Sequence, residues 1–185
     1  MEPDTPAAGG WLLDDLAVEV VRGDITDQPD VEAVVNAANA QLTTGGGVAG
    51  AIHRAAGAGL AEECAPLAPI APGECVATSA HGLPNRVVLH CLGPVHGRDH
   101  PADELLAACY RRALELADEH GLTSLATPAI STGAFGYPPD EAADVAARAV
   151  AATAGTLQRV HLLRFVCFDE AQVAHHRHAF DAVAG

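Results

Sequence analysis

The sequence predicts an α/β fold, a three-layer α/β/α sandwich around a mixed, mostly parallel central sheet. Segments with the apolar spacing of helices alternate with short apolar runs, which is the pattern of strands covered by helices on both faces. Before residue 48, two or three strand candidates follow one another with little helix between them, so the sheet is expected to be mixed. A length of 185 residues with 49% hydrophobic content suits one domain with a proper core.

The elements follow in order from one end of the chain to the other. Residues 1–10 are rich in Pro, Gly and acid, so we expect a loose N-terminal segment before a single domain over residues 11–185. The predicted strands cover residues 11–21, 31–35, 74–79, 86–92, 122–130 and 160–168, and the predicted helices cover residues 48–56, 60–67, 103–119, 140–154 and 170–183.

Local signals mark the boundaries of these elements. Residues 31–35 form a short continuous apolar run of the buried-strand type. Residues 82–85, Gly-Leu-Pro-Asn, are a turn signal between two strand candidates. Apolar positions at helical spacing over residues 103–119 end at Gly121, a residue typical of helix C-termini. Ligands in such sheets bind beyond the carboxyl ends of the strands, so the loops at those ends are the candidate site.

Composition excludes several classes of function. The chain has no lysine, so a P-loop and Schiff-base chemistry are both excluded. The formal net charge is −14, and no basic run is present. Because phosphate contacts to nucleic acid normally use cations, we expect no nucleic-acid partner.

The cysteines and the N-terminus predict a location. Five cysteines are widely spaced and odd in number, so we expect buried free thiols in a reducing compartment rather than a disulfide framework or a CxxC metal pair. The N-terminus has no signal-peptide pattern, and no stretch offers the ~18 apolar residues that a membrane span needs. We therefore predict a cytoplasmic protein with no membrane contact.

Two glycine-rich segments stand at predicted strand ends. Gly45, Gly46 and Gly47 come immediately before a predicted helix, where backbone N–H groups and the helix dipole can bind an anion without a cation. The alternative for a lone triple glycine is a flexible turn. A second glycine-rich segment at residues 132–136 favours a diphosphate held from both sides by backbone amides.

Four polar or aromatic side chains near these segments are candidates for ligand contacts. Asn36 and Asn39 can donate to and accept from ribose hydroxyls, although asparagine is also common in turns. Asp24 could accept from an adenine amine, although helix capping is the commoner role of such a residue. Phe168 closes the last predicted strand and could stack on a base or be an ordinary core aromatic.

Histidines are the remaining candidates. His53 lies four residues after Ala49 in a predicted helix, so the two share a face; a packed structural histidine is the alternative. His175, His176 and His178 form a tract in the terminal helix that could look like a metal site; 175 and 178 share a face, but no cysteine pair accompanies them. We expect surface histidines there rather than zinc, and no metal site in the protein.

Taken together, these residues resemble the macro domain family. The matching segments keep a consistent order from about residue 16 to the C-terminus. They are residues 23–26 (GDIT), 35–39 (VNAAN), 45–48 (GGGV), 52–57 (IHRAAG) and 128–138 (PAISTGAFGYP).

The resemblance implies an ADP-ribose site. Asp24 would hold the adenine amine with Ile25 beside it, Phe168 would stack on the adenine, and Asn39 would contact the distal ribose. The residues that would bind the diphosphate are Gly45, Gly46, Gly47 and Val48 in one loop and Ser131, Thr132, Gly133, Ala134, Phe135, Gly136 and Tyr137 in the other.

The branch that looks most similar is the MacroD type, whose members hydrolyse ADP-ribose esters on acidic side chains and deacetylate O-acetyl-ADP-ribose. That branch carries an aspartate, thought to activate or position water, where this chain has Ala49. Losing a general base costs roughly 10²- to 10⁴-fold. The resemblance nonetheless predicts a hydrolase for Glu- or Asp-linked mono-ADP-ribose, with Asn39 and His53 as catalytic residues.

Other functions remain open beside the hydrolase. One is a non-catalytic reader, a module that binds ADP-ribose or ADP-ribosylated proteins without turnover. The others are an O-acetyl-ADP-ribose deacetylase and a phosphatase for the terminal phosphate form of ADP-ribose. In each case the partners are ADP-ribose and ADP-ribosylated proteins, no cofactor is needed, and a monomer is favoured.

Overall fold

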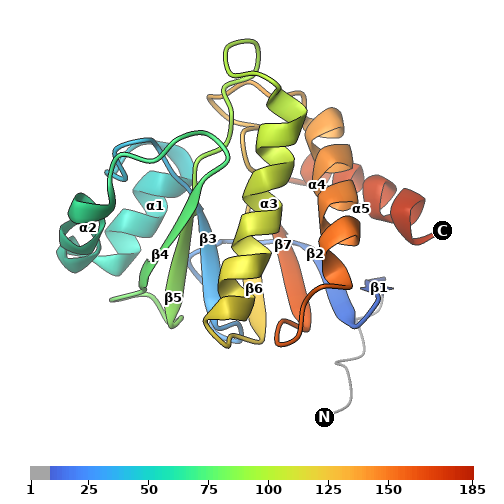
Figure 1. The fold of residues 1–185 in the computed structure, drawn as a ribbon, viewed down its shortest axis with the longest axis horizontal. Coiled ribbons are helices and arrows are strands. Elements are labelled where there is room, and N and C mark those ends of the chain that lie inside the picture. The colour runs from blue at the N-terminus through green and yellow to red at the C-terminus, as the bar shows by residue number, and fades with distance from the viewer. Residues whose placement is uncertain (1–8) are drawn as a thin grey trace.

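A computed structural model describes residues 9–185 of the chain (Figure 1). Residues 1–8 of the predicted loose N-terminal segment (residues 1–10) lie outside the described residues. The strands are β1 (Trp11–Leu13), β2 (Leu16–Arg22), β3 (Ala33–Ala37), β4 (Cys75–Ser79), β5 (Val87–Cys91), β6 (Ser124–Thr127) and β7 (Leu162–Cys167). The helices are α1 (Gly47–Ala56), α2 (Ala58–Cys64), the short 3₁₀ helix η1 (Ala65–Leu67), α3 (Ala102–Glu119), α4 (Pro139–Ala154) and α5 (Glu170–Ala184).

The strands form one mixed sheet in the order β1-β2-β7-β6-β3-β5-β4. The five central strands run parallel, and only the edge strands β1 and β4 pair antiparallel with their neighbours. Helical crossovers between parallel strands place helices on both faces, because a parallel connection must pass over the sheet. The predicted three-layer α/β/α sandwich with a mixed, mostly parallel sheet is confirmed.

Strand β3 shows how the two faces are built. Ala33 and Val35 point into the core under α3, α4 and α5, whereas Val34 points into the core under α1 and α2. Both cores are dry, so the strand reads as a continuous apolar run rather than an alternating one. Figure 1 shows α3 and α4 side by side across one face of the sheet, with α1 and α2 together at one side.

The larger core centres on an aromatic cluster. The Phe165 side chain is fully buried on β7, and its ring centroid lies 5.0–5.6 Å from those of Tyr110, His176 and Phe180. Trp11 stacks on Phe180 at 5.5 Å and closes the cluster at the edge of the sheet. Four of the seven aromatic residues of this chain thus gather where α3 and α5 meet the sheet. His176 is buried against Phe165, so the prediction of a surface histidine at this position is wrong.

Three predicted strands are split, shifted or shortened in the structure, whereas the other three lose at most two residues at either end. The segment 11–21, predicted as one strand, is split into β1 and β2 by a turn at Asp14, whose φ is 51°. The predicted strand 31–35 extends instead from residue 33 to residue 37, so Asn36 lies within β3. The predicted strand 122–130 is shorter because it ends before Pro128, which cannot donate to a ladder.

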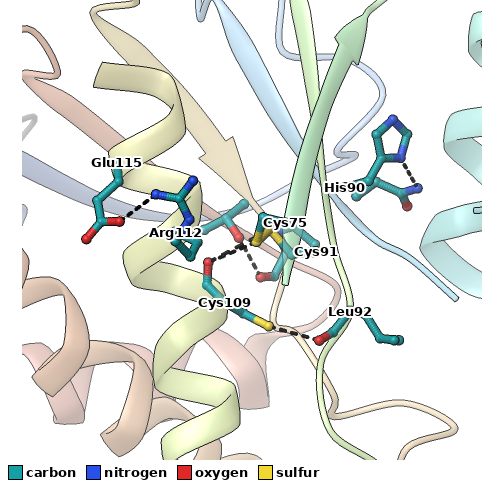
Figure 2. Close-up of a disulfide and its surroundings, with 10 residues drawn as sticks. Cys75, His90, Cys91, Leu92, Cys109, Arg112 and Glu115 are labelled. Atoms are coloured by element: carbon teal, nitrogen blue, oxygen red, sulfur yellow. Dashed lines mark hydrogen bonds and ion pairs between the residues drawn. A yellow bond between two sulfur atoms is a disulfide. The ribbon is translucent and has the colours of Figure 1, made fainter. Parts of the chain in front are cut away.

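The prediction that the cysteines are all free thiols, with no disulfide, is wrong for two of the five. Cys75 and Cys91 are directly opposite in the antiparallel β4–β5 pair, with Cα atoms 4.2 Å apart, and form a disulfide (Figure 2). The Cys109 carbonyl oxygen lies 3.5 Å from the Cys75 sulfur and 3.8 Å from the Cys91 sulfur. Cys64, Cys109 and Cys167 are buried free thiols, as predicted. Spacing along the chain did not reveal the pair because it arises from cross-strand register.

Within residues 9–185, none of the helices has the length and apolar character needed to cross a membrane.

Replacing Phe165 by alanine tests the aromatic core. We expect the free energy of unfolding to fall by about 3–5 kcal/mol, because the change leaves a cavity that the surrounding rings cannot fill. Urea denaturation measures this loss. Leu12→Ala is the matched control: Leu12 is exposed on β1, so its loss should cost about 1 kcal/mol or less. Equal costs for the two variants would contradict the proposed position of the core.

Candidate functional site

The parallel register brings the carboxyl ends of the strands to one edge of the sheet. Arg22 at the end of β2 pairs with Cys167 at the end of β7, and Ala37 at the end of β3 pairs with Cys91. The loops that follow these strands therefore meet, although Arg22 and Cys167 are 145 residues apart in sequence (167 minus 22). Those loops carry nearly all of the residues predicted to form the site.

Two cavities open at this edge. The first, about 380 Å³, is lined by Ala37, Ala38, Asn39, Gly45, Gly46, Gly47, Val48, Ala49, Gly93, Ala129, Ile130, Ser131, Gly133, Ala134 and Phe135. The second, about 850 Å³, shares the two glycine loops and adds residues from the β2 and β7 ends, including Asp24, Ile25, Thr132, Phe168, Gln172 and His175. Since Gly47, Val48, Ala129 and Gly133 line both, the cavities adjoin one another across the two loops.

The first glycine loop, residues 43–48, leads directly into α1. Gly47 has a φ of 57°, a conformation that side chains disfavour, and this turns the chain into the helix. Neither Gly46 nor any acidic residue caps the first turn of α1. Backbone N–H groups at this end of the helix thus remain available to an anion in the cavity.

Asn39 shapes this loop. Its side-chain Nδ2 donates to the Thr43 carbonyl at 2.8 Å, and its Oδ1 accepts from the Thr43 backbone N–H at 3.1 Å. The asparagine is thus both a lining residue of the first cavity and an anchor of the loop. One N–H of the side-chain amide is not used by Thr43 and can reach a ligand.

The second glycine loop, residues 131–137, is closed by a bond from the Tyr137 N–H to the Ser131 carbonyl at 2.9 Å. Ser131 has a φ of 68°, and its buried hydroxyl has no partner within the described residues. Gly93 stands against it, where a Cβ would collide with the hydroxyl. The loop is therefore held tightly against the end of β5.

Gly136 and Tyr137 are placed differently from the rest of the second loop. Neither lines the cavities, although residues 131–135 do. The Tyr137 side chain is buried in the larger core, and its ring lies 4.8 Å from that of His96. Their position suits support of the loop more than direct contact with a ligand.

Asp24 lies in the second cavity with one oxygen already engaged. Its Oδ1 accepts from the Thr26 backbone N–H at 2.9 Å and from the Thr26 hydroxyl at 2.7 Å. The hydroxyl and then the backbone N–H of Thr26 lower the pKa of Asp24, so this group is a carboxylate at neutral pH. Its Oδ2 remains able to accept from a ligand, and Ile25 packs beside it in the smaller core.

Phe168 is the most exposed large apolar side chain of the described residues, at 82%. Its backbone N–H donates to Gln172 Oε1 at 2.8 Å, which holds the start of α5 against the strand end. Gln172 and His175 of α5 also line the cavity, and neither was singled out as a ligand contact from sequence. The sequence signal that could have indicated these two contacts is their spacing of one helical turn, shortly after the end of a strand.

His53 does not line either cavity. It is buried one turn beyond Ala49 on α1, and burial lowers its pKa, so the ring is neutral at pH 7. Its Nε2 has no partner within the described residues. Ala49, by contrast, lines the first cavity.

Behind the cavities lies a buried polar chain centred on His90. Asn36 Nδ2 lies 3.1 Å from His90 Nδ1, and Thr78 Oγ1 lies 2.9 Å from His90 Nε2. Burial first, and then nearby His53, lower the pKa of His90 to about 4. A neutral ring, with one donor and one acceptor nitrogen, fits this chain. Figure 2 shows His90 on the opposite side of β5 from Cys91.

The first cavity contains no ionisable lining side chain among the described residues, and the second contains Asp24, Asp169 and His175 but no arginine. No three His, Cys, Asp or Glu side chains in residues 9–185 gather in a way that could hold a metal. Beside backbone amides, the first cavity therefore offers the side chains of Asn39 and Ser131. The second offers those of Asp24, Thr132, Asp169, Gln172 and His175.

The structure is an α/β/α domain with a two-part cleft at the carboxyl ends of the parallel strands of a mixed sheet. The family model of the Macro domain matches residues 35–146, which is more than half of the chain. The chain belongs to the macro domain family.

Relatives and solved structures agree with this assignment. The chain is 45% identical to the O-acetyl-ADP-ribose deacetylase of Klebsiella pneumoniae, over 86% of this chain and 93% of the relative. It is 43% identical to a macro domain-containing protein of Chlorobaculum tepidum, over 86% and 92%.

Among solved structures, the Oceanobacillus iheyensis macrodomain with ADP superposes with a TM-score of 0.89 at 37% identity, covering 94% of this chain and 95% of that one. The Trypanosoma brucei macrodomain in complex with ADP-ribose gives 0.82 at 36% identity, covering 96% and 73%.

The buried histidines predict a pH dependence of stability. His90 is neutral in the folded state down to about pH 4 but takes up a proton near pH 6.5 when unfolded. The free energy of unfolding should therefore fall by up to roughly 3 kcal/mol as the pH drops from 6.5 to 4, and the His90 contribution should then level off.

Urea denaturation of the wild type and of His90→Gln between pH 7 and pH 4 measures this effect. Glutamine can donate and accept in the same chain but does not titrate. We expect the free energy of unfolding of the variant to depend less steeply on pH. The remaining dependence would come from His53 and His176, whose pKa values are also lowered by burial. Identical slopes would mean that His90 is not the responsible group.

Proposed function

We propose that the protein binds ADP-ribose in the two adjoining cavities. The adenosine would occupy the second cavity, the distal ribose the first, and the diphosphate the space between them. The observation that carries this proposal is that both glycine loops, residues 43–48 and 131–137, reach the place where the cavities meet, since Gly47, Val48 and Gly133 line both.

The second cavity suits an adenine base. Asp24 Oδ2 is free to accept from the exocyclic amine, while Oδ1 is fixed by Thr26. Phe168 offers an exposed ring for stacking, and Ile25 supplies an apolar wall. The carboxylate would select a base that carries an amine, through a hydrogen bond. The aromatic ring would bind the flat face of the base by stacking.

The diphosphate would be bound without cations. No arginine lines either cavity among the described residues, and the chain has no lysine. Backbone N–H groups of the two loops and of the uncapped α1 N-terminus supply the positive potential instead. An acidic protein with a net charge of −14 can thus still bind an anion through local dipoles.

The first cavity would hold the distal ribose and its ester. We propose that the protein hydrolyses carboxylic esters of this ribose, both the Glu- or Asp-linked mono-ADP-ribose of modified proteins and O-acetyl-ADP-ribose. Relatives with 45–46% identity are named for the second reaction. Both substrates present the same bond, an acyl ester of a ribose hydroxyl.

Catalysis would rest mainly on positioning. Ala49 stands where the MacroD type carries an aspartate, and alanine accepts no proton, so an oxygen of the ligand's own phosphate would take the proton of the attacking water. Asn39, through its remaining N–H, would orient the distal ribose. His53 would act from behind Ala49 by fixing α1. Orientation alone can supply a large share of a rate enhancement.

A second candidate function is a reader of ADP-ribosylated proteins without turnover. The specific observation in its favour is the first cavity itself, which has no ionisable lining side chain among the described residues. The two functions share the binding mode and differ only in whether the ester is cleaved. In either case we propose a cytoplasmic, monomeric protein whose partners are ADP-ribosylated proteins.

Phe168→Ala tests the binding mode. Loss of the stacking ring should weaken ADP-ribose binding by about 10-fold or more, since stacking on an aromatic is worth about 1–3 kcal/mol per base. Calorimetry with ADP-ribose measures the change. Because Phe168 is exposed, its melting temperature should match the wild type. Unchanged affinity would remove Phe168 from the site, and no binding of the wild type at millimolar ligand would refute ADP-ribose binding altogether.

Ala49→Asp tests the catalytic proposal. An aspartate in the first cavity would provide the missing proton acceptor and should raise kcat for O-acetyl-ADP-ribose by about 10²-fold or more. Ala49→Asn is the matched control, since it has the same shape and no basic group. The rate of acetate release at saturating O-acetyl-ADP-ribose is measured for the wild type and for both variants.

Single-turnover assays separate the hydrolase from the reader. Stoichiometric wild-type protein is incubated with a Glu-linked mono-ADP-ribosylated protein and with O-acetyl-ADP-ribose. Release of either ester supports the hydrolase. Binding of both without release would sink the hydrolase and leave the reader.

A further inference from the structure

We propose that Gln28 and Arg164 are positioning residues for nucleobase recognition, and that they hold Asp24 in place so that its free oxygen distinguishes a base with an amine from one without. This proposal rests on the proposed ADP-ribose site and adds two residues that lie outside both cavities. It concerns the selectivity of the adenine end rather than the chemistry at the distal ribose.

Arg164 is the hub of the network. It lies on β7 with its side chain 13% exposed, and its guanidinium bonds to three residues of a different part of the chain. Nε donates to Glu19 at 2.8 Å, while Nη1 and Nη2 donate to the two oxygens of Asp30 at 2.8 and 2.7 Å. Nη1 also donates to Gln28 Oε1 at 3.0 Å. A two-pronged arginine–carboxylate contact fixes both distance and orientation.

Gln28 transmits this anchoring to Asp24. The glutamine is buried, and its Nε2 donates to the Asp24 carbonyl at 2.9 Å, while Oε1 accepts from Arg164. Its own carbonyl accepts from Asn85 Nδ2 at 2.8 Å. Both polar atoms of the side chain and the backbone carbonyl are thus hydrogen-bonded. Gln28 therefore connects β7 to the loop that follows β2.

Asp24 is consequently fixed at two points. Its carbonyl accepts from Gln28 and from the Asp27 N–H at 3.0 Å, and its Oδ1 accepts twice from Thr26. Only Oδ2 has no bond to the described residues. A carboxylate with one tethered oxygen presents the other in a single direction, which a freely rotating surface aspartate does not.

The segment from residue 23 to residue 30 needs such support because it contains no helix or strand. Side-chain bonds hold it to the sheet, and those of Gln28 and Asp30 end on Arg164. The same strand, β7, ends immediately before Phe168. One strand therefore supports both sides of the proposed base site: the carboxylate through Arg164 and Gln28, and the ring directly.

This arrangement makes a specific prediction about base selectivity. Adenine presents an amine to Asp24 Oδ2, whereas hypoxanthine presents a carbonyl oxygen at the same position and would be repelled. If the bonds from Gln28 to Arg164 and to the Asp24 carbonyl are lost, the Asp24 carboxylate can move away from the base. Affinity for the adenine ligand then falls, and the penalty on the hypoxanthine ligand shrinks.

Gln28→Glu is the test, with calorimetry on ADP-ribose and on inosine diphosphate ribose. Glutamate keeps an acceptor for Arg164 but replaces the donor to the Asp24 carbonyl by a second acceptor. We expect ADP-ribose affinity to fall about fivefold to tenfold, inosine diphosphate ribose affinity to stay within about twofold, and the ratio of the two to fall accordingly.

Two further variants protect the interpretation. Gln158→Glu adds the same charge at an exposed position and should leave the ratio unchanged. Because added charge repels both diphosphates alike, it lowers both affinities and does not move the ratio. Gln28→Met removes both bonds without any charge and should lower the ratio as well, which covers the case in which the glutamate variant does not fold.

The outcomes separate this inference from the function on which it rests. A wild type that prefers ADP-ribose, with Gln28 variants that keep the same ratio, would overturn the role of Gln28 and Arg164 alone. A wild type that binds both ligands equally would overturn base reading by Asp24. A wild type that binds neither would overturn the proposed function and this inference with it.

Discussion

The parallel register of the central strands is the constraint on which the site depends. Parallel pairing places the carboxyl ends of β2, β7, β6, β3 and β5 at one edge of the sheet, so the loops that follow these strands lie side by side there. The two cavities are the space left between those loops. Even Gln28 and Arg164, which lie outside the cavities, are brought together because β2 and β7 are neighbours.

The charge of the molecule and the charge of its proposed ligand are both negative. In the proposed binding mode this is resolved locally, because glycine loops and an uncapped helix start would present backbone N–H groups in place of side-chain cations. Backbone dipoles are fixed by the fold and lose little entropy when a ligand arrives. The first loop is held by the bonds between Asn39 and Thr43, and the second is closed by the bond from the Tyr137 N–H to the Ser131 carbonyl.

Binding and bond cleavage place different demands on this site. Binding needs shape, amide groups, a ring and a carboxylate, and the cavities contain all four. Cleavage also needs a proton acceptor near the ester, and in the first cavity that acceptor would have to come from the ligand. His53 and His90 are neutral and buried, and neither lines a cavity.

Periodicity, turn signals and motif order in the sequence were enough to predict the three-layer fold, the helices near residues 103–119, 140–154 and 170–183, and the segments that meet at the site. They were enough because burial and local conformation leave a direct imprint on residue spacing. Side-chain partners and strand register leave none, because they arise from packing between distant segments. Only the tertiary structure therefore revealed the Cys75–Cys91 disulfide, the inward turn of Tyr137, the burial of His53 and the bond between Gln28 and Arg164.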